Sequence, residues 1–528
     1  MDIFIMSLLP YYLFLILKVR YGLYMLQQNS YNTENRYLKW TIKNYKKVFL
    51  NIELLSFIVL LAIKFLDSFY YSLIVITFYI VMAYYEIYKL SHEQSKKKFN
   101  VTSRVKRLIT TILLIFLILN ICIFYKYDTS NNFVYYLVLI LFGYFSYYVV
   151  LISNIINIPV EKLVYKHYYN KAKNKLKDMK NLSVVGITGS YGKTSSKNIV
   201  NSILSADYIT YPTPKSFNTP YGLMISINNG IDKFTNMFIA EMGAYKKGEI
   251  KELCDFVNPK YGILTTIGVA HLETFKSEQN IIDGKFELIE SLPSDGVAIL
   301  NKDDIKQATH KINNNCKVLW IGIDNKDADV VASNIKLSSA GTTFDVKFKD
   351  LENKYTFTTS LLGKYNIYNI LDGLALGHYL NISIDKMIQK VRTLKPIEHR
   401  LELRKYYDIT LIDDAFNSNP VGSSMALDVL SLMPGKKIIV TPGMIELGEK
   451  EYEYNYNFGK KISEVCDEVI LVGENQTKPI KKALDDNKFT KVHIINDVKE
   501  AFTLMNKLKD KNTYVLLEND LPDIFNEK

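Results

Sequence analysis

A glycine-rich loop followed by lysine, threonine and serine is the part of the sequence best suited to chemistry on phosphate. With the residue before it, the loop consists of Thr188, Gly189, Ser190, Tyr191, Gly192, Lys193, Thr194 and Ser195. An apolar run before it predicts a strand over 183–188, and the residues after it predict a helix. This order brings backbone N–H groups to a helix N-terminus, which favours phosphate. We therefore predict nucleotide binding here.

The residue types within the loop indicate how it would act. Gly189 and Gly192 permit unusual dihedral angles and a close approach. Lys193 can bridge terminal phosphates, and Thr194 can hold Mg²⁺. The strict phosphate-loop pattern is not met, because Ile187 stands where its first glycine would be. The loop alone leaves open whether the nucleotide is only bound, is hydrolysed for transport, or activates a carboxylate.

Two further residues follow apolar runs that predict strands. Glu241 ends the run 237–240, and a carboxylate at this edge of a sheet can coordinate Mg²⁺ beside a phosphate loop. An ordinary strand-end acid is the alternative. His271 follows the run 262–267, although a lone histidine is more often structural than a ligand.

The loop in the form TGSYGKTS resembles that of the Mur ligases, ATP-dependent enzymes that join amino acids or peptides to peptidoglycan precursors. The likeness is greatest to the D-alanyl-D-alanine-adding branch and covers roughly residues 181–450. It continues in order through SFNTPYG (216–222), EMGAYKKGEI (241–250), TTIGVAHLE (265–273), GKFELIESL (284–292), LNKDD (300–304), HRLE (399–402), DDAFNSNP (413–420) and GMIELGE (443–449).

The resemblance implies a metal site and a modified lysine. It implies that Glu241 binds Mg²⁺ and that His271 serves a second metal ion. Lys285 matches a lysine that the family carbamylates, although by itself it would be interpreted as a solvated helix residue. Carbamylation turns this cation into an anionic oxygen ligand for Mg²⁺.

The resemblance also implies how the nucleotide is held and used. Asn301 would contact adenine, and the last domain would bring Arg400 near phosphate and Asp414 near ribose. A turn role is the alternative for Asp414. Lys193, Mg²⁺ and Arg400 would then form an electrostatic clamp, with Lys193, His271, Lys285 and Arg400 as the catalytic residues. In the implied reaction a carboxylate attacks the γ-phosphate of ATP, and an amine displaces phosphate from the acyl phosphate to leave an amide.

The sequence departs from the family at both ends. Soluble Mur ligases begin with a domain that binds a uridine nucleotide sugar, and apolar segments occupy that place here. Near the C-terminus a basic KGSR-like motif is replaced by LENDLP (517–522). We expect an amine substrate that differs or lacks a carboxylate, unless Glu518 and Asp520 only cap a turn.

Composition limits the class of protein. The 528 residues allow two to four structural units. The formal charge of +11 could suggest nucleic acid, but much of the basic excess lies in two short segments between apolar runs, so no nucleic-acid partner is expected. Four scattered cysteines without a CxxC pair indicate neither disulfides nor zinc, and favour a reduced, cytosolic catalytic part.

Long apolar windows before residue 160 predict about five membrane spans, since crossing takes about 20 apolar residues. The windows are 3–17, 49–66, 69–88, 108–125 and 133–158, of which 3–17 is short and contains Pro10. The first window lacks the flanks of a cleaved signal peptide. The windows are too long and too apolar on all sides for buried helices of a soluble domain, and their few charges argue against a substrate path.

Charge predicts the orientation of these spans. Segments 18–48 and 89–107, the latter with Lys96, Lys97 and Lys98, each carry seven Lys or Arg residues, which short cytoplasmic loops collect. The N-terminus is therefore expected outside, and everything after about 160 in the cytoplasm.

We therefore predict a transmembrane α-helical region with a cytoplasmic linker (1–180), an α/β ATP-binding Mur-ligase-like domain (181–396) and a doubly wound, Rossmann-like C-terminal domain (397–528). The chain would be a multi-pass membrane enzyme that couples a lipid-linked or nucleotide-linked cell-envelope precursor to an amino acid or small amine, with ATP and Mg²⁺. The alternatives are a poly-γ-glutamate synthetase, an ATP-binding membrane transporter or regulator, and an inactive ligase-like scaffold.

Overall fold

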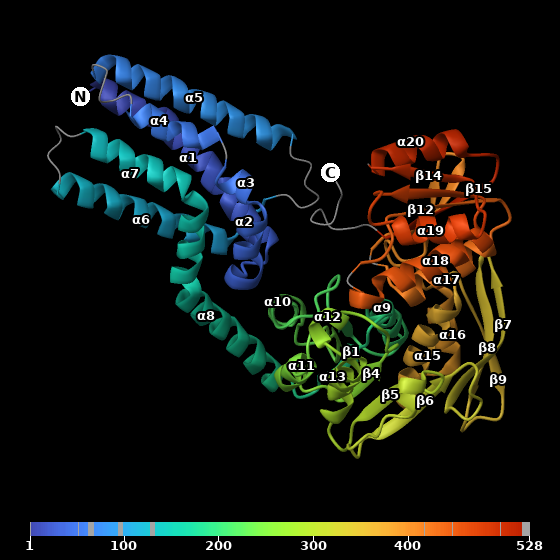
Figure 1. Cartoon of the computed structure of the whole chain (residues 1–528). Coiled ribbons are helices and arrows are strands. Elements are labelled where there is room, and N and C mark those ends of the chain that lie inside the picture. Colours follow the sequence, from blue (N-terminus) through green and yellow to red (C-terminus); the bar gives the residue numbers. More distant parts are fainter. Residues whose placement is uncertain are drawn as a thin grey trace. The chain divides into compact units, whose positions relative to one another are not determined.

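The computed structural model describes residues 2–50, 52–61, 68–92, 99–126, 132–416, 418–445, 447–496 and 498–519. The chain divides into two compact units, Met1–His167 and Tyr168–Lys528. The first is helical, and the second contains two β-sheets with covering helices (Figure 1).

The helical unit contains three helices that are long and apolar enough to cross a membrane, among the residues described: Phe69–Ser91, Ser103–Cys122 and Ser146–Asp178. In this unit α1 packs on α5, and α4 packs on α7. The elements are α1 (Asp2–Gln28), η1 (Thr33–Tyr37), α2 (Leu38–Lys43), α3 (Tyr45–Val48), η2 (Ile52–Leu54), α4 (Leu55–Leu61), α5 (Ser68–His92), α6 (Ser103–Lys126), α7 (Asn132–Tyr144) and α8 (Ser146–Asp178).

The apolar windows predicted from the sequence match the observed helices to different degrees. Windows 69–88 and 108–125 lie within α5 and α6, and window 3–17 lies within α1, which contains Pro10. Window 133–158 is divided between α7, which ends at Tyr144, and α8, which begins at Ser146.

Part of the predicted topology falls outside the described residues. Window 49–66 is described only as far as Leu61, where it contains the short α4. The short segments between apolar windows near 67 and over 126–132, which carry almost no positive charge, fall wholly or largely on residues that are not described. The same is true of the basic run Lys96 to Lys98 and of Asp520 to Pro522.

A buried ion pair joins α1 to the segment before α4. Lys18 donates to Glu53, and both side chains are almost fully buried. Lys18 also donates to the carbonyl of Gly143, 2.9 Å away, close to the break between α7 and α8. A side chain that engages a helix carbonyl is one recognised cause of such a break.

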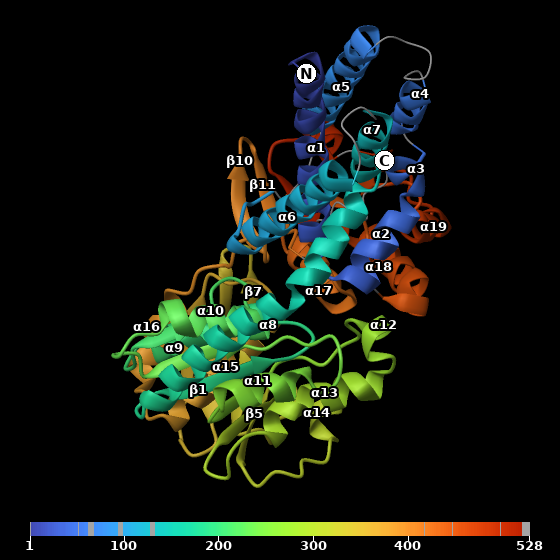
Figure 2. The same cartoon turned by 90° about the vertical axis from the view of Figure 1, so that its left-hand side faces the viewer.

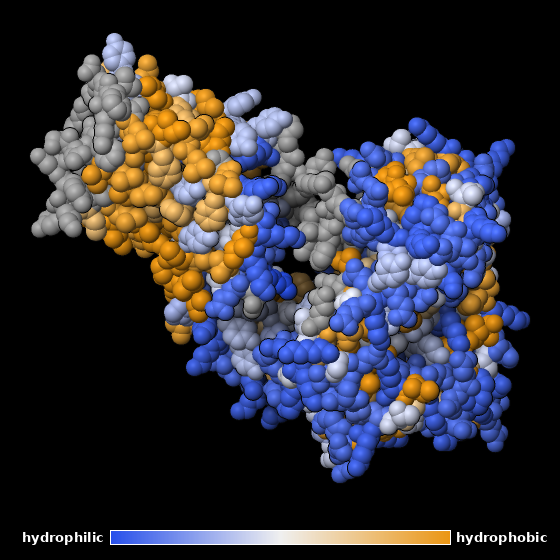
Figure 3. Space-filling view, viewed as in Figure 1, coloured by the Kyte–Doolittle hydropathy of each residue, from blue (hydrophilic) through white to orange (hydrophobic). Residues whose placement is uncertain are grey.

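The surface of the helical unit is apolar. In Figure 3 hydrophobic residues cover much of the visible face of this unit, whereas that of the α/β unit is mostly hydrophilic. Large apolar side chains on α5 and α6, such as Ile80 and Leu117, are more than half exposed. A lipid environment would cover such a surface without a free-energy cost.

The first sheet of the α/β unit has nine strands in the order β2-β3-β1-β4-β5-β6-β7-β8-β9, parallel as far as β7 and antiparallel over β7 to β9. Its elements are β1 (Ser183–Thr188), α9 (Lys193–Leu204), β2 (Thr210–Pro212), α10 (Pro220–Gly230), β3 (Met237–Glu241), α11 (Glu249–Val257), β4 (Tyr261–Leu264), α12 (Leu272–Phe275), α13 (Glu278–Glu290), β5 (Val297–Asn301), α14 (Ile305–Ala308), β6 (Lys317–Gly322), β7 (Val330–Ser338), β8 (Gly341–Phe348), β9 (Lys354–Thr359), α15 (Lys364–Tyr379) and α16 (Ile384–Arg392).

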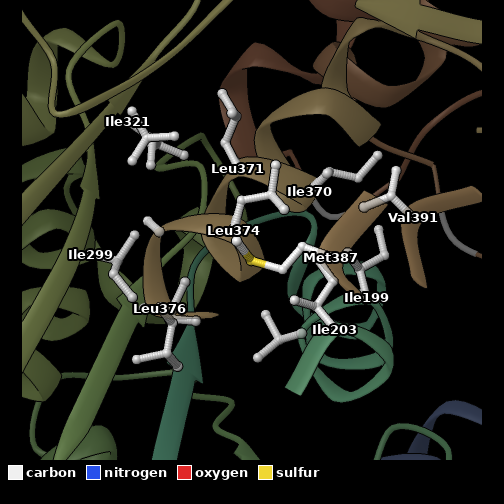
Figure 4. Close-up of a cluster of buried hydrophobic side chains, with 14 of the residues drawn as sticks. Ile199, Ile203, Ile299, Ile321, Ile370, Leu371, Leu374, Leu376, Met387 and Val391 are labelled. Atoms are coloured by element: carbon white, nitrogen blue, oxygen red, sulfur yellow. The ribbon is translucent and has the colours of Figure 1, made fainter. Parts of the chain in front are cut away.

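Buried apolar contacts with neighbouring helices hold α9, the helix that begins at Lys193, in place. Figure 4 shows Ile199 and Ile203 of α9 beside Leu374 of α15 and Met387 of α16. A Cβ on Gly373 would lie 2.6 Å from Ile203, so glycine allows α15 and α9 to pack closely. The phosphate loop is therefore mounted on a helix that cannot easily shift.

The second sheet has six strands in the order β10-β11-β15-β12-β13-β14, all parallel except β10. Figure 2 shows β10 beside β11, its antiparallel partner. Apolar runs in the sequence at 409–412, 437–440, 469–472, 493–495 and 514–517 predict five strands, and the structure confirms them as β11 to β15. The elements are β10 (Glu402–Tyr406), β11 (Ile409–Asp414), α17 (Pro420–Ser431), β12 (Lys436–Thr441), η4 (Gly448–Lys450), α18 (Glu451–Val465), β13 (Glu468–Val472), α19 (Lys478–Asp486), β14 (Val492–Ile495), α20 (Val498–Leu508) and β15 (Thr513–Glu518).

Candidate active site

The glycine loop joins β1 to α9 as its sequence predicts. Gly192 precedes α9 with a φ of 82°, in the left-handed region that glycine adopts without strain. At Gly189 a Cβ would lie only 2.0 Å from the hydroxyl of Thr265, so any side chain would collide. Both glycines are thus required by the path of the backbone.

The loop is tied to the segment that carries His271. Thr265 donates to the carbonyl of Tyr191 at 2.5 Å, and the Tyr191 hydroxyl donates to the carbonyl of Val269 at 2.6 Å. The Ser190 hydroxyl donates to the carbonyl of Gly268 at 2.8 Å. The position of the histidine is therefore coupled to the phosphate loop.

Lys193 lies over the loop itself. Its ammonium donates to the carbonyls of Gly189 (2.6 Å) and Ser190 (3.1 Å). Burial lowers the pKa of Lys193 to about 8, a shift that Glu241 opposes and Arg400 reinforces. A cation that is poorly solvated gains more from an anionic partner, so the loop is prepared for phosphate.

Glu241 ends β3 as expected, and two side chains hold it that sequence reasoning missed. Lys197 donates to one carboxylate oxygen and Asn218 to the other, each at 3.1 Å. Lys197 lies one helical turn after Lys193, and this i,i+4 spacing was the available signal. Asn218 lies within the SFNTPYG motif, to which no role had been assigned.

Lys285 is not a solvated helix residue. Its side chain on α13 is 3% exposed, with the ammonium 5.5 Å from the centre of the Phe275 ring. Burial lowers the pKa of Lys285 to about 7, and the charge on Lys193 contributes in the same direction. A substantial fraction of this amine is therefore neutral near pH 7.

Two adjacent cavities contain most of the predicted residues. The larger, about 340 Å³, is lined from the first sheet's domain by Ser190, Tyr191, Gly192, Lys193, Thr194, Glu241 and His271. The smaller, about 60 Å³, is lined by Gly189, Ser190, Lys193, His271 and Lys285. Lys193 and His271 belong to both, so residues 193, 241, 271 and 285 gather around one region.

The C-terminal domain closes one side of the larger cavity. Arg400 lines it together with Phe416, Ser418 and Asn419, and its guanidinium lies 4.6 Å from the centre of the Phe416 ring. Tyr245 lies on the other side, with its ring centre 4.5 Å from that of His271. The wall thus combines cations for phosphate with aromatic and amide groups that sequence reasoning did not assign.

Four predicted residues do not line these two cavities. Thr188 is buried and donates to the carbonyl of Met242 at 2.9 Å, and Ser195 lines a separate cavity of about 110 Å³. Asn301 accepts a bond from the backbone of Asp303 at 2.9 Å, within the turn before α14. The adenine-contacting role of Asn301 stays a prediction.

Asp414 lies at the end of β11, in register with Glu518 at the end of β15. Burial raises the pKa of the Asp414 carboxyl to about 6, although Arg400 opposes the shift. Burial also raises the pKa of Glu518 well above its usual value, and the adjacent Asp414 contributes. The Ser418 hydroxyl donates to Glu518 at 2.6 Å, which links this acidic pair to the cavity wall.

The site fits Mg²⁺ shared between protein and nucleotide. Mg²⁺ needs only one or two protein oxygens, because it keeps waters and binds substrate phosphates. The Thr194 hydroxyl and the Glu241 carboxylate line the same cavity. Within the described ranges, no group of three His, Cys, Asp or Glu side chains could hold a metal ion alone.

Comparison with known proteins agrees with this geometry. Residues 187–377 match the Mur ligase middle domain, and residues 399–518 match the Mur ligase glutamate ligase domain. The chain is 31% identical to the UDP-N-acetylmuramoyl-tripeptide–D-alanyl-D-alanine ligase of Bacillus subtilis over 296 residues, which are 55% of this chain. It spans only 63% of the length of that relative.

Two other matches cover more of the compared protein. The ligase of the same name from Buchnera aphidicola (subsp. Acyrthosiphon pisum) is 30% identical, over 63% of this chain and 73% of that protein. The MurF ligase from Thermotoga maritima, solved with ADP, is 26% identical, with a TM-score of 0.61 over 67% of this chain and 80% of that one. Together with the two matched domains, these similarities show that the chain belongs to the Mur ligase family.

Proposed function

We propose that this protein is a membrane-anchored, ATP-dependent carboxylate–amine ligase of cell-envelope synthesis, with its catalytic domains in the cytoplasm. The observation that carries the proposal is the larger cavity, where Lys193, Thr194 and Glu241 meet Arg400 of the C-terminal domain. A phosphate loop faced by an arginine from a second domain suits transfer of a phosphoryl group in an enclosed site.

The proposed reaction has two steps. A substrate carboxylate attacks the γ-phosphorus of ATP, the bond to ADP breaks, and an acyl phosphate forms. An amine then attacks the acyl carbon, phosphate leaves, and a proton from the amine passes to solvent or a nearby base. Lys193 and Arg400 lie where they can stabilise charge on the phosphoryl oxygens. Mg²⁺ on Thr194 and Glu241 would supply further positive charge there.

We further propose that Lys285 is carbamylated. Its neutral amine would attack CO₂ to form an N–C bond, with loss of one proton and creation of an anionic carbamate. The pKa of about 7, caused mainly by burial, favours this chemistry because only the neutral amine is nucleophilic. Lys285 lines the small cavity beside Lys193 and His271, so the new oxygens would face the phosphate site.

The carboxylate substrate is proposed to be carried on a membrane lipid. The family match begins at residue 187, and the chain before it includes three helices that could span a membrane, among the residues described. The names of the Bacillus subtilis and Buchnera aphidicola relatives specify a UDP-N-acetylmuramoyl tripeptide and D-alanyl-D-alanine as their substrates. Here Glu518, linked to the cavity wall through Ser418, stands in the region where the resemblance implies a basic motif, so we propose an amine substrate other than D-alanyl-D-alanine.

Product analysis on the full-length protein tests this proposal. The protein in lipid nanodiscs would receive ATP, Mg²⁺, a panel of amines, and either a polyprenyl-linked or a UDP-linked muramoyl peptide. We expect one ADP for each amide bond, detected by mass spectrometry, with the lipid-linked substrate preferred. Turnover of the UDP-linked substrate alone would contradict the lipid-linked part. Glutamate polymers without another carboxylate would indicate a poly-γ-glutamate synthetase, and ATP consumption without amide would contradict the ligase.

A further inference from the structure

An apolar groove of about 420 Å³ lies in the helical unit, mainly between α1 and α6. Its floor is formed by four buried apolar side chains, Leu15, Leu23, Ile112 and Phe142. Its edges include Ile16 and Leu113, which are 64% and 61% exposed. The groove is thus open on the apolar outer surface, where a lipid chain could enter sideways.

The two ends of the groove differ in polarity. At one end Tyr12 packs edge-on against Phe116, with ring centres 5.8 Å apart. At the other, the Arg20 guanidinium lies 5.5 Å from the centre of the Phe99 ring. From Tyr12 to Leu23 an α-helix rises about 16 Å, which is half of a ~30 Å hydrocarbon layer. The groove therefore has about the length of one leaflet and has a cation near one end.

The cationic end lies where two basic segments meet. Gln27, at the end of α1, and Asn100, just before α6, bond to each other reciprocally at 3.0 and 3.2 Å. Gln27 lies in segment 18–48 and Asn100 in segment 89–107, and the Lys and Arg content of both segments predicts a cytoplasmic location. Arg20 is thus expected at the cytoplasmic boundary, on the side proposed for the catalytic domains.

Arg20 is available for an anion. Within the part of the chain that the structure describes, Lys18 pairs with Glu53, Lys89 with Glu86, and Arg107 with Glu161, whereas no described carboxylate pairs with Arg20. An arginine at the mouth of an apolar groove suits a phosphate whose attached chain lies in the groove. A single groove accommodates one chain, unlike the two chains of a phospholipid.

We propose that this groove binds the polyprenyl chain of a phosphate-linked lipid substrate, with the phosphate beside Arg20. The inference rests on the proposed function, because it specifies where a lipid-linked substrate would be held. Such binding would keep the headgroup at the cytoplasmic surface and raise its concentration near the ligase domains.

Photo-crosslinking of the full-length protein tests the inference without relying on catalysis. The probe is a polyprenyl phosphate with a diazirine in its chain, in phosphatidylcholine nanodiscs. Labelled residues are located by mass spectrometry. We expect labelling of the facing sides of α1 and α6, with competition by unlabelled polyprenyl phosphate at least tenfold better than by polyprenol or phosphatidylglycerol. Leu113→Trp, which fills the groove, and Arg20→Gln should each reduce labelling severalfold.

Two matched variants control for general disturbance. Leu114→Trp alters the next residue of α6, which is 52% exposed and does not line the groove, and Arg36→Gln removes an exposed arginine of the same basic segment. Both should label as the unmodified protein does. Labelling spread evenly over all the apolar helices, or unchanged in Leu113→Trp, would overturn the inference. The readout is binding, so the two proposals can fail separately. Amide formation with an unlabelled groove would contradict the groove and leave the ligase proposal standing. Specific labelling without amide formation would support the groove and contradict the ligase proposal.

Discussion

Lys197 and Glu241 form an ion pair at 3.1 Å beneath the phosphate site, and each side chain is only 1% exposed. Asn218 satisfies the second carboxylate oxygen. A carboxylate proposed to help hold Mg²⁺ is therefore kept in place by a lysine that itself lies behind the cavity.

Replacing this lysine should destabilise the α/β unit. In Lys197→Met the buried Glu241 loses its partner, and breaking such a pair costs about 3–5 kcal/mol. Urea denaturation of the full-length protein, followed by a probe of the α/β unit, should show a clear fall in midpoint. Lys251→Met is the matched control, because its pair with Asp255 is exposed and such pairs contribute at most about 1 kcal/mol. Equal midpoints for the two variants would contradict the structural role of Lys197.

The carbamylation of Lys285 should depend on pH. Because folding lowers its pKa to about 7, the neutral amine grows from about one tenth at pH 6 to about nine tenths at pH 8. We expect both the carbamate and the ligase activity to rise over this range. With ¹³C-bicarbonate, a carbamate carbon should appear by NMR in the unmodified protein and in Lys247→Arg, an exposed lysine variant. It should be absent in Lys285→Arg, and a signal that persists there would assign the carbamate elsewhere.

Gly189→Ala should weaken nucleotide binding more than tenfold while most of the fold survives. The new Cβ would meet the Thr265 hydroxyl at 2.0 Å and break the bond that fixes the loop. A loss of affinity for ATP above tenfold, or about 1.4 kcal/mol, is expected in titration calorimetry. Gly248→Ala is the control, since this glycine also has a positive φ but faces open space. ATP affinity within twofold of normal in Gly189→Ala would show that the loop can rearrange.

The buried ion pair between Lys18 and Glu53 should affect the stability of the helical unit more when one charge is removed than when both are. In Lys18→Met, Glu53 is left buried without its cation, so the detergent-purified protein should lose its monodisperse form at a lower temperature. The double variant Lys18→Met/Glu53→Gln removes both charges and should recover much of the loss. Lys39→Met, at an exposed lysine of α2, should have little effect. A double variant no better than the single one would mean that Lys18 acts mainly through Gly143.

Much of the candidate site follows from local sequence. The order of strand, glycine loop and helix predicts the phosphate loop, and an acid at the end of an apolar run predicts Glu241 at the sheet edge. The alternation of strands and helices after residue 397 likewise predicts β11 to β15. These features depend on residues close together in the chain, so their pattern carries the information.

Other features depend on contacts between distant residues. A lysine on a helix looks solvated in the sequence, and only the packing of α13 beside Phe275 makes Lys285 a weakly basic, buried amine. The apolar window 133–158 gave no sign that the helix breaks at Phe145, close to a carbonyl that Lys18 engages from 125 residues away.

The sequence by itself therefore determined which chemical groups this protein carries and on which elements they lie, because hydrophobic periodicity and glycine placement act locally. Only the tertiary structure decided which charges are buried, which pairs neutralise them and which side chains share a cavity, because burial and Coulomb energies depend on distances in space rather than in the chain.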